Sequence, residues 1–197
     1  MNNSIVSDKK NIRHSLRAKR KSIGKTERQQ IQKQITRQLL PLIKRNSNIA
    51  AYMAFGSELD LSDFIRIAQK RGAKIWMPYI EKRQRRLWFS AYQSQAKNKE
   101  YAYGIVQFAG KKRRIESMQL VLVPLLGVDK TGIRMGQGGG YYDKSLSYCD
   151  RASRPKLIGV GFACQKVASL PKEPWDRALD AFICEEGVSY FSCHDIA

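Results

Sequence analysis

The chain has 197 residues, enough to bury a sizeable apolar core without disulfides or structural metals. Its composition, 43% hydrophobic and 27% charged, excludes a disordered chain. The 36 Lys and Arg residues outnumber the 17 Asp and Glu residues, which gives a net charge of +19. A field of this size attracts polyanions such as nucleic acid, nucleotides or polycarboxylates. A solvated basic surface without a partner explains the same charge, so the charge alone selects no function.

Export and membrane insertion are both disfavoured by the sequence. Met1–Lys10 lacks the apolar core of a secretory signal. The longest apolar run, Leu120–Val128, is broken by Pro124 and is too short to span a bilayer. We therefore expect a soluble, cytoplasmic protein. The cysteines lack Cys-x-x-Cys spacing, and in a reducing compartment we expect free thiols at Cys149, Cys164, Cys184 and Cys193.

Two basic helices are expected at the start of the chain. The first begins at Ser7 or Asp8 and carries Ile12 and Leu16 on one face. In the second, Thr26 and Gln29 have the spacing of a capping box. The apolar residues that follow at helical spacing are Ile31, Ile35, Leu39 and Leu42. We expect this helical segment, residues 7–45, to pack on the rest of the domain.

From residue 48 onward, strands alternate with helices. The expected strands cover residues 48–54, 74–80, 87–92, 119–126, 156–163 and 179–184. The expected helices cover residues 60–71, stopped by Gly72, and residues 141–149. This alternation predicts a single-domain α/β layered fold, with a central, largely parallel sheet flanked by helices. Lys82–Arg86 and Lys111–Arg114 are expected to be exposed basic loops.

A glycine-rich loop follows the most apolar strand. After residues 119–126 the chain reads Gly127-Val128-Asp129-Lys130-Thr131-Gly132-Ile133-Arg134-Met135-Gly136-Gln137-Gly138-Gly139-Gly140-Tyr141-Tyr142-Asp143. Glycines let backbone N–H groups converge on an anion, a following helix N-terminus adds partial positive charge, and Arg134 supplies a forked donor suited to phosphate. The pattern is neither a P-loop nor a dinucleotide fingerprint. A flexible turn between strand and helix is the alternative interpretation.

This loop resembles the glycine-rich motif of the 5-formyltetrahydrofolate cyclo-ligase family, Asp-x-x-Gly-x-Arg-(Leu/Met)-Gly-x-Gly-x-Gly-Tyr-Tyr-Asp. Three further segments resemble the family in the same order. They are Lys9–Arg13, Phe55–Asp60, and the block from Gly159-Val160-Gly161-Phe162 through Gln165 to Leu170-Pro171-Lys172-Glu173-Pro174-Trp175-Asp176. Gly104-Ile105-Val106-Gln107-Phe108 departs from the Gly-Ile-x-Glu-Pro stretch that members often carry.

The resemblance implies an ATP-dependent ligase that converts 5-formyltetrahydrofolate to 5,10-methenyltetrahydrofolate, with release of ADP and phosphate. The formyl oxygen attacks the γ-phosphate to give an iminium phosphate, and N10 then closes onto the formyl carbon as phosphate leaves. Phosphoryl transfer depends chiefly on positioning and charge neutralisation. A chain with two histidines and many cations suits that chemistry. The implied partners are small molecules, ATP and a folate with one or more glutamates, bound by a monomer.

The resemblance also implies site residues. Arg134, Glu58 and Lys9 are the implied catalytic residues. The implied ATP ligands are Lys9, Lys10, Arg13, Arg134, Met135, Gly136, Gln137, Gly138, Gly139, Gly140, Tyr141 and Tyr142. The implied folate ligands are Met53, Phe55, Glu58, Gln137, Gly138, Gly139, Gly140 and Tyr141. Magnesium prefers oxygen ligands and often bridges phosphates; Asp143 is the first implied ligand and Asp180 the second.

Less specific interpretations exist for several of these residues. Lys9 and Arg13 lie four residues apart, so they share a helix face and suit a triphosphate, but a solvated basic helix has the same pattern. Glu58 would bind pterin N–H groups or the N10 proton, or else cap the next helix. Met53 is equally typical of a core position. A basic RNA-binding protein, using the two basic patches with Trp88 and Tyr103, remains the rival function, although no RNA-binding motif is present.

Overall fold

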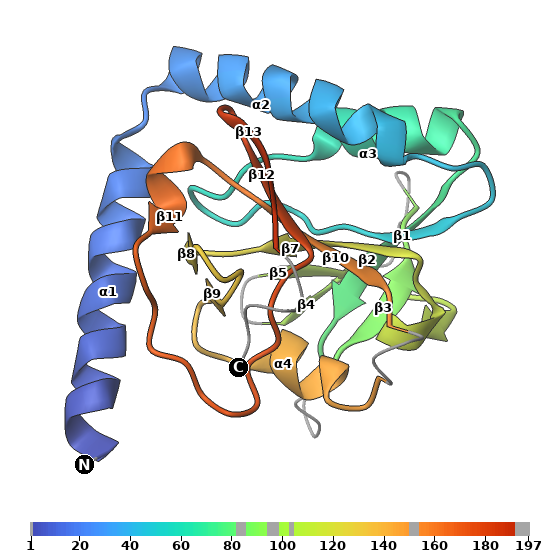
Figure 1. Ribbon diagram of the computed structural model, residues 1–197. Helices are drawn as coiled ribbons and strands as arrows, with labels where there is room; N and C mark the ends of the chain where they lie inside the picture. The colour runs from blue at the N-terminus through green and yellow to red at the C-terminus, as the bar shows by residue number, and fades with distance from the viewer. Residues whose placement is uncertain (1, 82–85, 94–98, 103–104, 150–153, 192–197) are drawn as a thin grey trace.

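The structure is a computed structural model that describes residues 2–81, 86–93, 99–102, 105–149 and 154–191, with side chains for residues 8–81, 86–93, 106–149 and 154–191. An eight-stranded sheet lies at its centre in the order β13-β12-β10-β7-β1-β2-β3-β6 (Figure 1). Its strands are β1 (Asn48–Ala50), β2 (Lys74–Tyr79), β3 (Trp88–Ala91), β6 (Lys112–Arg113), β7 (Leu120–Pro124), β10 (Lys156–Val160), β12 (Ala181–Cys184) and β13 (Gly187–Tyr190).

The middle of the sheet is parallel and its edges are antiparallel. β12, β10, β7, β1 and β2 pair in parallel, whereas β13, β3 and β6 pair antiparallel. The predicted largely parallel sheet is therefore confirmed. Two small sheets were not expected: β11 (Lys166–Val167), β8 (Gly127–Asp129) and β9 (Arg134–Met135) form one, and β4 (Lys99–Ala102) with β5 (Ile105–Phe108) forms the other.

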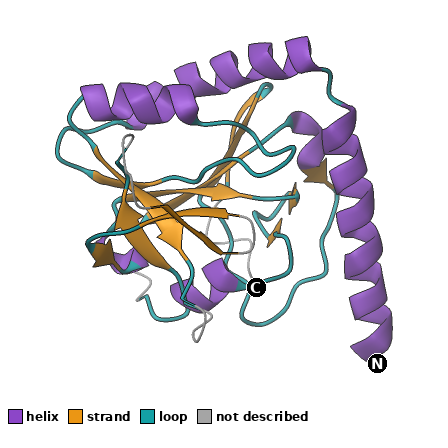
Figure 2. Ribbon diagram, turned by 180° about the vertical axis from the view of Figure 1, so that it is seen from behind, coloured by secondary structure: helices purple, strands orange, loops and turns teal. Residues whose placement is uncertain are grey.

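Helices cover both faces of the large sheet (Figures 1 and 2). On one face, α2 (Lys25–Leu39) and α3 (Ser62–Lys70) bury Ile35, Leu39 and Phe64 against the strands. On the other face, α4 (Tyr141–Leu146) buries Leu146 in a second apolar cluster. Because both faces are covered, β7 is buried along nearly its whole length, as its continuous apolar sequence predicted.

The N-terminal helix α1 (Asn2–Ser22) runs down one side of the molecule, beside the small sheet of β8, β9 and β11 (Figures 1 and 2). Leu16 is buried on its inner face, and Ile12 packs against a small cluster of Ile133, Met135 and Leu170. The expected packing of this helix through Ile12 and Leu16 is confirmed. The helix begins before Ser7, because none of residues 2–22 is a glycine or a proline that would break it.

Several predicted boundaries are wrong. The capping box at Thr26 does not form: the N-cap of α2 is Gly24, without a side-chain cap, so Thr26 lies inside the first turn. Residues 51–54 leave the sheet, because the chain turns there toward residues 55–58. The strand expected over 156–163 ends at Val160, ahead of the 3-10 helix η3 (Ala163–Gln165). Two further 3-10 helices are η1 (Leu40–Leu42) and η2 (Ile115–Ser117).

Other boundaries shift less. The remaining predicted strands and the helix over 141–149 are each present but shorter than expected. Gly72 ends α3 as predicted: its φ is +81°, and its N–H donates to the carbonyl of Gln69. Lys111–Arg114 is not simply a loop, because Lys112 and Arg113 form the edge strand β6. Gln107, in the stretch that departs from the family pattern, is buried and accepts a hydrogen bond from the N–H of Ile80.

A few expectations fall outside the described residues: Tyr103, Cys193, and all of the basic segment 82–86 except Arg86. The other cysteines, Cys149, Cys164 and Cys184, are thiols rather than disulfides, as expected. Within the part of the chain that the structure describes, no helix is long and apolar enough to cross a membrane.

Candidate functional site

The glycine loop, residues 136–140, connects the β8–β9 hairpin to α4. Gly138 has φ +108° and Gly140 has φ +64°, backbone conformations that residues with a Cβ rarely adopt. A residue with a side chain would therefore be strained at either position. Asp129 shapes the hairpin that leads into the loop, because one of its carboxylate oxygens accepts from the N–H groups of Thr131 and Ile133 and the other accepts from Leu170.

The expected contribution of a helix N-terminus to anion binding needs correction. The helix that follows the loop, α4, has only six residues, and Gly140 caps it in a left-handed conformation without a side-chain hydrogen bond. Six peptide dipoles make a small macrodipole. Positive charge at the loop therefore comes mainly from the side chains of α1.

A row of cations on α1 contacts the loop and the segment beside it. The Lys9 ammonium lies 3.0 Å from Glu173, in the C-terminal block that resembles the family. Arg13 Nε donates to the carbonyl of Gly136 at 3.1 Å, and its guanidinium also lies against Gly138. One turn further on, Arg17 donates to Gln137. Lys9 and Arg13 are thus engaged with the site rather than solvated, whereas Lys10 is exposed.

Arg134 is not a free donor in this structure. Its side chain is only 4% exposed and forms an ion pair with Asp143 at 2.6 Å. A second guanidinium nitrogen donates to the carbonyl of Arg177. The expected phosphate ligand and the expected magnesium ligand are therefore paired with each other. A nucleotide with its metal offers each of them a new partner of the opposite charge.

The second expected metal ligand, Asp180, is engaged elsewhere. Its two carboxylate oxygens accept from the guanidinium of Arg154 at 2.5 and 2.8 Å, and one of them also accepts from the N–H of Leu157. The carboxylate that lies near Asp143 is instead Asp176. Burial raises the pKa of Asp176, and the negative charge of Asp143 raises it further, while Lys9 and Arg134 lower it. Asp176 is therefore a further candidate ligand beside Asp143, and the assignment of Asp180 stays a prediction.

The donor set fits magnesium. Among the described residues, no group of three or more His, Cys, Asp or Glu side chains gathers at one point. A binding site that consists of protein ligands alone is therefore not indicated. Mg²⁺ typically keeps several waters and binds through one or two carboxylates plus substrate phosphates, and Asp143 with Asp176 can supply the carboxylates.

Glu58 belongs to a tight turn at the end of the segment that follows β1. Its Oε2 accepts from the N–H of Phe55 at 3.1 Å, and its Oε1 lies 3.4 Å from the amide nitrogen of Gln137. Arg20 stabilises the turn by donating a hydrogen bond to Ser57 Oγ. The alternative role of Glu58 as a helix cap is wrong, because the first turn of α3 is served by Asp60, whose carboxylate accepts from Ser62.

Two tyrosines lie near Glu58: Tyr52 is buried, and Tyr142 is half-buried. Burial and the nearby charge of Glu58 raise the pKa values of both Tyr52 and Tyr142, so both phenols stay protonated at neutral pH. The Tyr52 hydroxyl donates to the carbonyl of Leu59. The Tyr142 hydroxyl is buried and has no hydrogen-bond partner among the described residues. Tyr142, which was expected at ATP, thus has its hydroxyl in the protein interior, near the charge of Glu58.

The apolar side chains expected around the folate differ in their surroundings. Phe55 is 54% exposed, an unusual position for a phenylalanine. Tyr141 lies directly over Gly139, where an added Cβ would come within 2.7 Å of its ring. Met53 is half-buried and packs against the core cluster beneath α2 and α3. The role of Phe55 and Tyr141 at the folate stays a prediction, and Met53 is at least partly a core residue.

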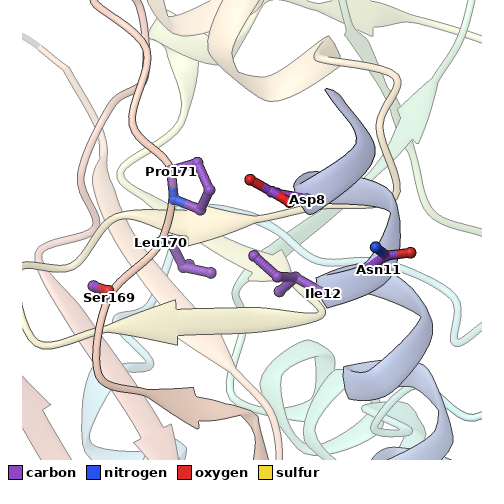
Figure 3. A pocket seen from close by; sticks show the side chains of 6 residues that line it. All are labelled: Asp8, Asn11, Ile12, Ser169, Leu170 and Pro171. Carbon is purple, nitrogen blue, oxygen red and sulfur yellow. The ribbon is translucent and has the colours of Figure 1, made fainter. Parts of the chain in front are cut away.

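A separate pocket of about 560 Å³ lies on the opposite flank of α1 from Arg17. Its lining residues are Asp8, Asn11, Ile12, Ser169, Leu170 and Pro171 (Figure 3). Asp8 and Ile12 point from the helix toward Leu170 and Pro171 in this view. None of the expected ATP or folate ligands lines this pocket.

Sequence reasoning missed Arg17, Glu173 and Asp176 as site residues. The helical spacing that selected Lys9 and Arg13 also contains Arg17, four residues further on, so the signal was present. Glu173 and Asp176 stand in the block that resembles the family, but the sequence does not show that this block folds back onto α1. Their proximity to Lys9 and Asp143 is a long-range contact that only the fold provides.

The basic patches of the RNA-binding alternative have cations stacked on their aromatic rings. The Arg114 guanidinium lies 3.3 Å from the Trp88 ring centroid, and Arg113 lies 5.1 Å from that of Trp76. Base stacking needs an accessible aromatic face. Arg114 covers one face of Trp88, so this arrangement does not favour the RNA-binding alternative.

Comparison with known proteins bears on the family and the fold of the chain. A model of the 5-formyltetrahydrofolate cyclo-ligase family matches residues 5–185. A curated 5-formyltetrahydrofolate cyclo-ligase of Haemophilus influenzae is 27% identical, over 85% of this chain and 92% of the relative. The solved 5,10-methenyltetrahydrofolate synthetase of Aquifex aeolicus superposes with a TM-score of 0.79 at 25% identity and covers 92% of each chain. That of Mycoplasma pneumoniae, at 22% identity, shares the fold with a TM-score of 0.74 over 90% of this chain and 99% of its own.

Proposed function

The chain belongs to the 5-formyltetrahydrofolate cyclo-ligase family, a family of ATP-dependent ligases, and from this membership and the site geometry we propose the following residue roles. The reaction converts 5-formyltetrahydrofolate and ATP to 5,10-methenyltetrahydrofolate, ADP and phosphate. The observation that carries the proposal is the position of the glycine loop. Arg13 of α1 contacts Gly136 at one end of it, and the next residue, Gln137, lies within hydrogen-bond distance of Glu58.

ATP binds with its phosphates between α1 and the glycine loop. Backbone N–H groups of residues 136–140 face the phosphate oxygens, and Arg13 and Lys9 neutralise their charge. Arg134 exchanges Asp143 for a phosphate oxygen. Asp143 and Asp176 would hold Mg²⁺, which supplies charge neutralisation at the phosphates when bound. The protein's contribution to this step is position and charge, as phosphoryl transfer requires.

The folate binds on the Glu58 side of the loop. Phe55 and Tyr141 receive its rings, and Glu58 accepts from pterin N–H groups or takes the proton that N10 loses as the ring closes. The formyl oxygen attacks the γ-phosphorus, ADP leaves, and N10 attacks the formyl carbon. The carbon–oxygen bond then breaks and phosphate departs. The glutamate tail, with one or more carboxylates, suits the protein's net charge of +19.

The test is a direct assay. Purified protein is mixed with 5-formyltetrahydrofolate and Mg-ATP, and the absorbance of the methenyl product is followed. We expect product only when ATP, the folate and magnesium are all present, with ADP formed in equal amount. Hydrolysis of ATP that is independent of the folate, or no methenyl product at all, would contradict the proposal. From the family membership we also propose a cytoplasmic monomer.

A further inference from the structure

Gln137 is the only residue of the glycine loop with a side chain beyond hydrogen, and this side chain lies between two charged groups. Its amide oxygen accepts from Arg17 Nη2 at 2.7 Å. Its amide nitrogen donates toward Glu58 Oε1 at 3.4 Å. The three side chains come from three separate parts of the chain: α1, the loop, and the turn after β1.

Arg17 decides which way the amide of Gln137 points. A guanidinium can only donate hydrogen bonds, so the amide oxygen must face Arg17. The amide NH₂ group then faces Glu58, whose ionised carboxylate can only accept. A half-turn of the amide would set its oxygen against the carboxylate and its NH₂ group against the guanidinium, and both contacts would be repulsive. Both contacts involve one charged partner, and the contact to Arg17 is the shorter, so it contributes more to the choice.

The carboxylate of Glu58 is fixed by this arrangement at both oxygens. Oε2 accepts from the N–H of Phe55 within the same turn, and Oε1 is left to Gln137. On the other side, Arg13 holds the carbonyl of Gly136, one residue before Gln137. Two successive turns of α1 thus hold two successive residues of the loop, one through its backbone and one through its side chain.

We propose that Arg17 is a positioning residue. It holds the Gln137 amide in the orientation that donates to Glu58, and it thereby couples the ATP-facing loop to the folate-facing turn. Arg17 acts through Gln137 and does not touch either substrate. The consequence for folate rests on the proposed role of Glu58, whereas the orientation of the amide rests on the three side chains alone.

The first test compares single variants. Arg17→Leu should raise the KM for 5-formyltetrahydrofolate about three- to tenfold, the size expected for one lost hydrogen bond, and leave the KM for ATP within about twofold. Arg17→Lys retains a donor and should recover most of the effect. Lys21→Gln removes the same charge from an exposed position on α1 and should leave both constants unchanged. An equal effect of Lys21→Gln would show that only the overall charge matters and would overturn the proposal.

The second test is a double-mutant cycle with Gln137→Ala. If Arg17 acts only through Gln137, then Arg17→Leu should have no further effect once Gln137 is alanine. Additive effects would show that Arg17 acts by a route other than Gln137 and would sink the positioning role. Melting temperatures identify a variant that fails to fold; if Arg17→Leu does so, Gln137→Ala, which removes the same amide, should raise the KM for 5-formyltetrahydrofolate by the same factor, and an unchanged KM would overturn the proposal.

A third measurement is independent of activity. The side-chain NH₂ signals of Gln137 in the ligand-free protein should shift in Arg17→Leu and in Glu58→Gln, and stay in place in Lys21→Gln. Unchanged signals in Arg17→Leu would contradict the proposal even in an active enzyme. Shifted signals in a protein that makes no methenyl product would support the role of Arg17 and instead refute the proposed function.

Discussion

At the scale of single residues, the ion pair between Arg134 and Asp143 links the two charges that we propose for Mg-ATP binding. Arg134 is almost fully buried and Asp143 is 24% exposed, so the pair is only partly screened by water. Removing one member of such a pair leaves the other without its partner. Substitutions here therefore change both nucleotide binding and local stability, and a useful experiment has to separate the two.

Arg134→Ala should raise the KM for ATP or lower kcat by about ten- to a hundredfold, because a charge-assisted contact of roughly 1.5 to 3 kcal/mol is lost. Steady-state kinetics with varied ATP measure this. The matched control is Arg66→Ala, which removes an arginine paired with Asp63 on the exposed surface of α3, where both side chains are more than half exposed. The control should leave kinetics and stability nearly unchanged. Wild-type kinetics in a folded Arg134→Ala protein would remove this residue from the ATP site.

Asp143→Asn and Asp176→Asn should each move the magnesium dependence of turnover to higher concentration, because each substitution keeps the shape of the side chain and removes its charge. Asp180→Asn should leave the magnesium curve unchanged and lower the melting temperature instead, since Arg154 loses its partner. The three variants are distinguished by measuring turnover at increasing Mg²⁺ concentration and saturating ATP. A shifted curve in Asp180→Asn alone would instead support Asp180 as the second ligand.

At the scale of elements, different parts of α1 have two different roles, contact with the site and attachment of the helix to the core. Its middle part carries Lys9, Arg13 and Arg17, which contact the glycine loop and the segment beside it. Its C-terminal end anchors the helix, because the buried Arg20 donates to the carbonyl of Leu125 just after β7 and to Ser57 in the turn that carries Glu58. Burial lowers the pKa of Arg20, yet a guanidinium remains charged at neutral pH. The same helix thus fixes both the ATP-facing and the folate-facing segment.

The glycine loop gives an element-scale prediction. Gly138→Val should abolish turnover and change the melting temperature little, because valine strongly disfavours φ +108° and the exposed loop would rearrange rather than the core. Activity and thermal unfolding are measured on the same preparation. Gly24→Ala, at a glycine with φ −64° and open space around its Cα, is the control and should remain active. Full activity in Gly138→Val would show that the loop does not need this conformation.

The order of the elements was readable from the sequence, and their long-range contacts were not. Continuous apolar runs identified β7 and the parallel centre of the sheet, because strands buried on both faces leave no polar alternation. The short strands β8, β9 and β11 were not predicted, because two or three residues are too few to show the alternation of polar and apolar side chains that identifies a strand. Arg134 was recognised as a site residue, but its pairing with Asp143 depends on how the hairpin meets α4. Asp176 was missed for the same reason.

At the scale of the whole molecule, the net charge of +19 is distributed unevenly. The exposed surface of α1 and α2 carries many cations, and Glu27 is the one acidic residue between Lys9 and Arg45. The exposed side of α2 has no large apolar side chain among those that the structure finds exposed. The exposed side of α2 can therefore attract phosphate groups through charge, but its described side chains include no large exposed apolar residue.

We predict that RNA or DNA binds weakly, without sequence preference, and with a steep dependence on salt, because the release of counterions alone drives such binding. ATP and the folate should lose much less affinity with salt, since their contacts lie in a partly desolvated site where screening is poorer. Both affinities are measured at low and at physiological ionic strength. Reversal of two exposed charges on α2, Lys33→Glu with Arg37→Glu, should weaken nucleic-acid binding and leave turnover intact. Tight, sequence-selective RNA binding at physiological salt, together with no turnover of 5-formyltetrahydrofolate, would instead support the RNA-binding alternative.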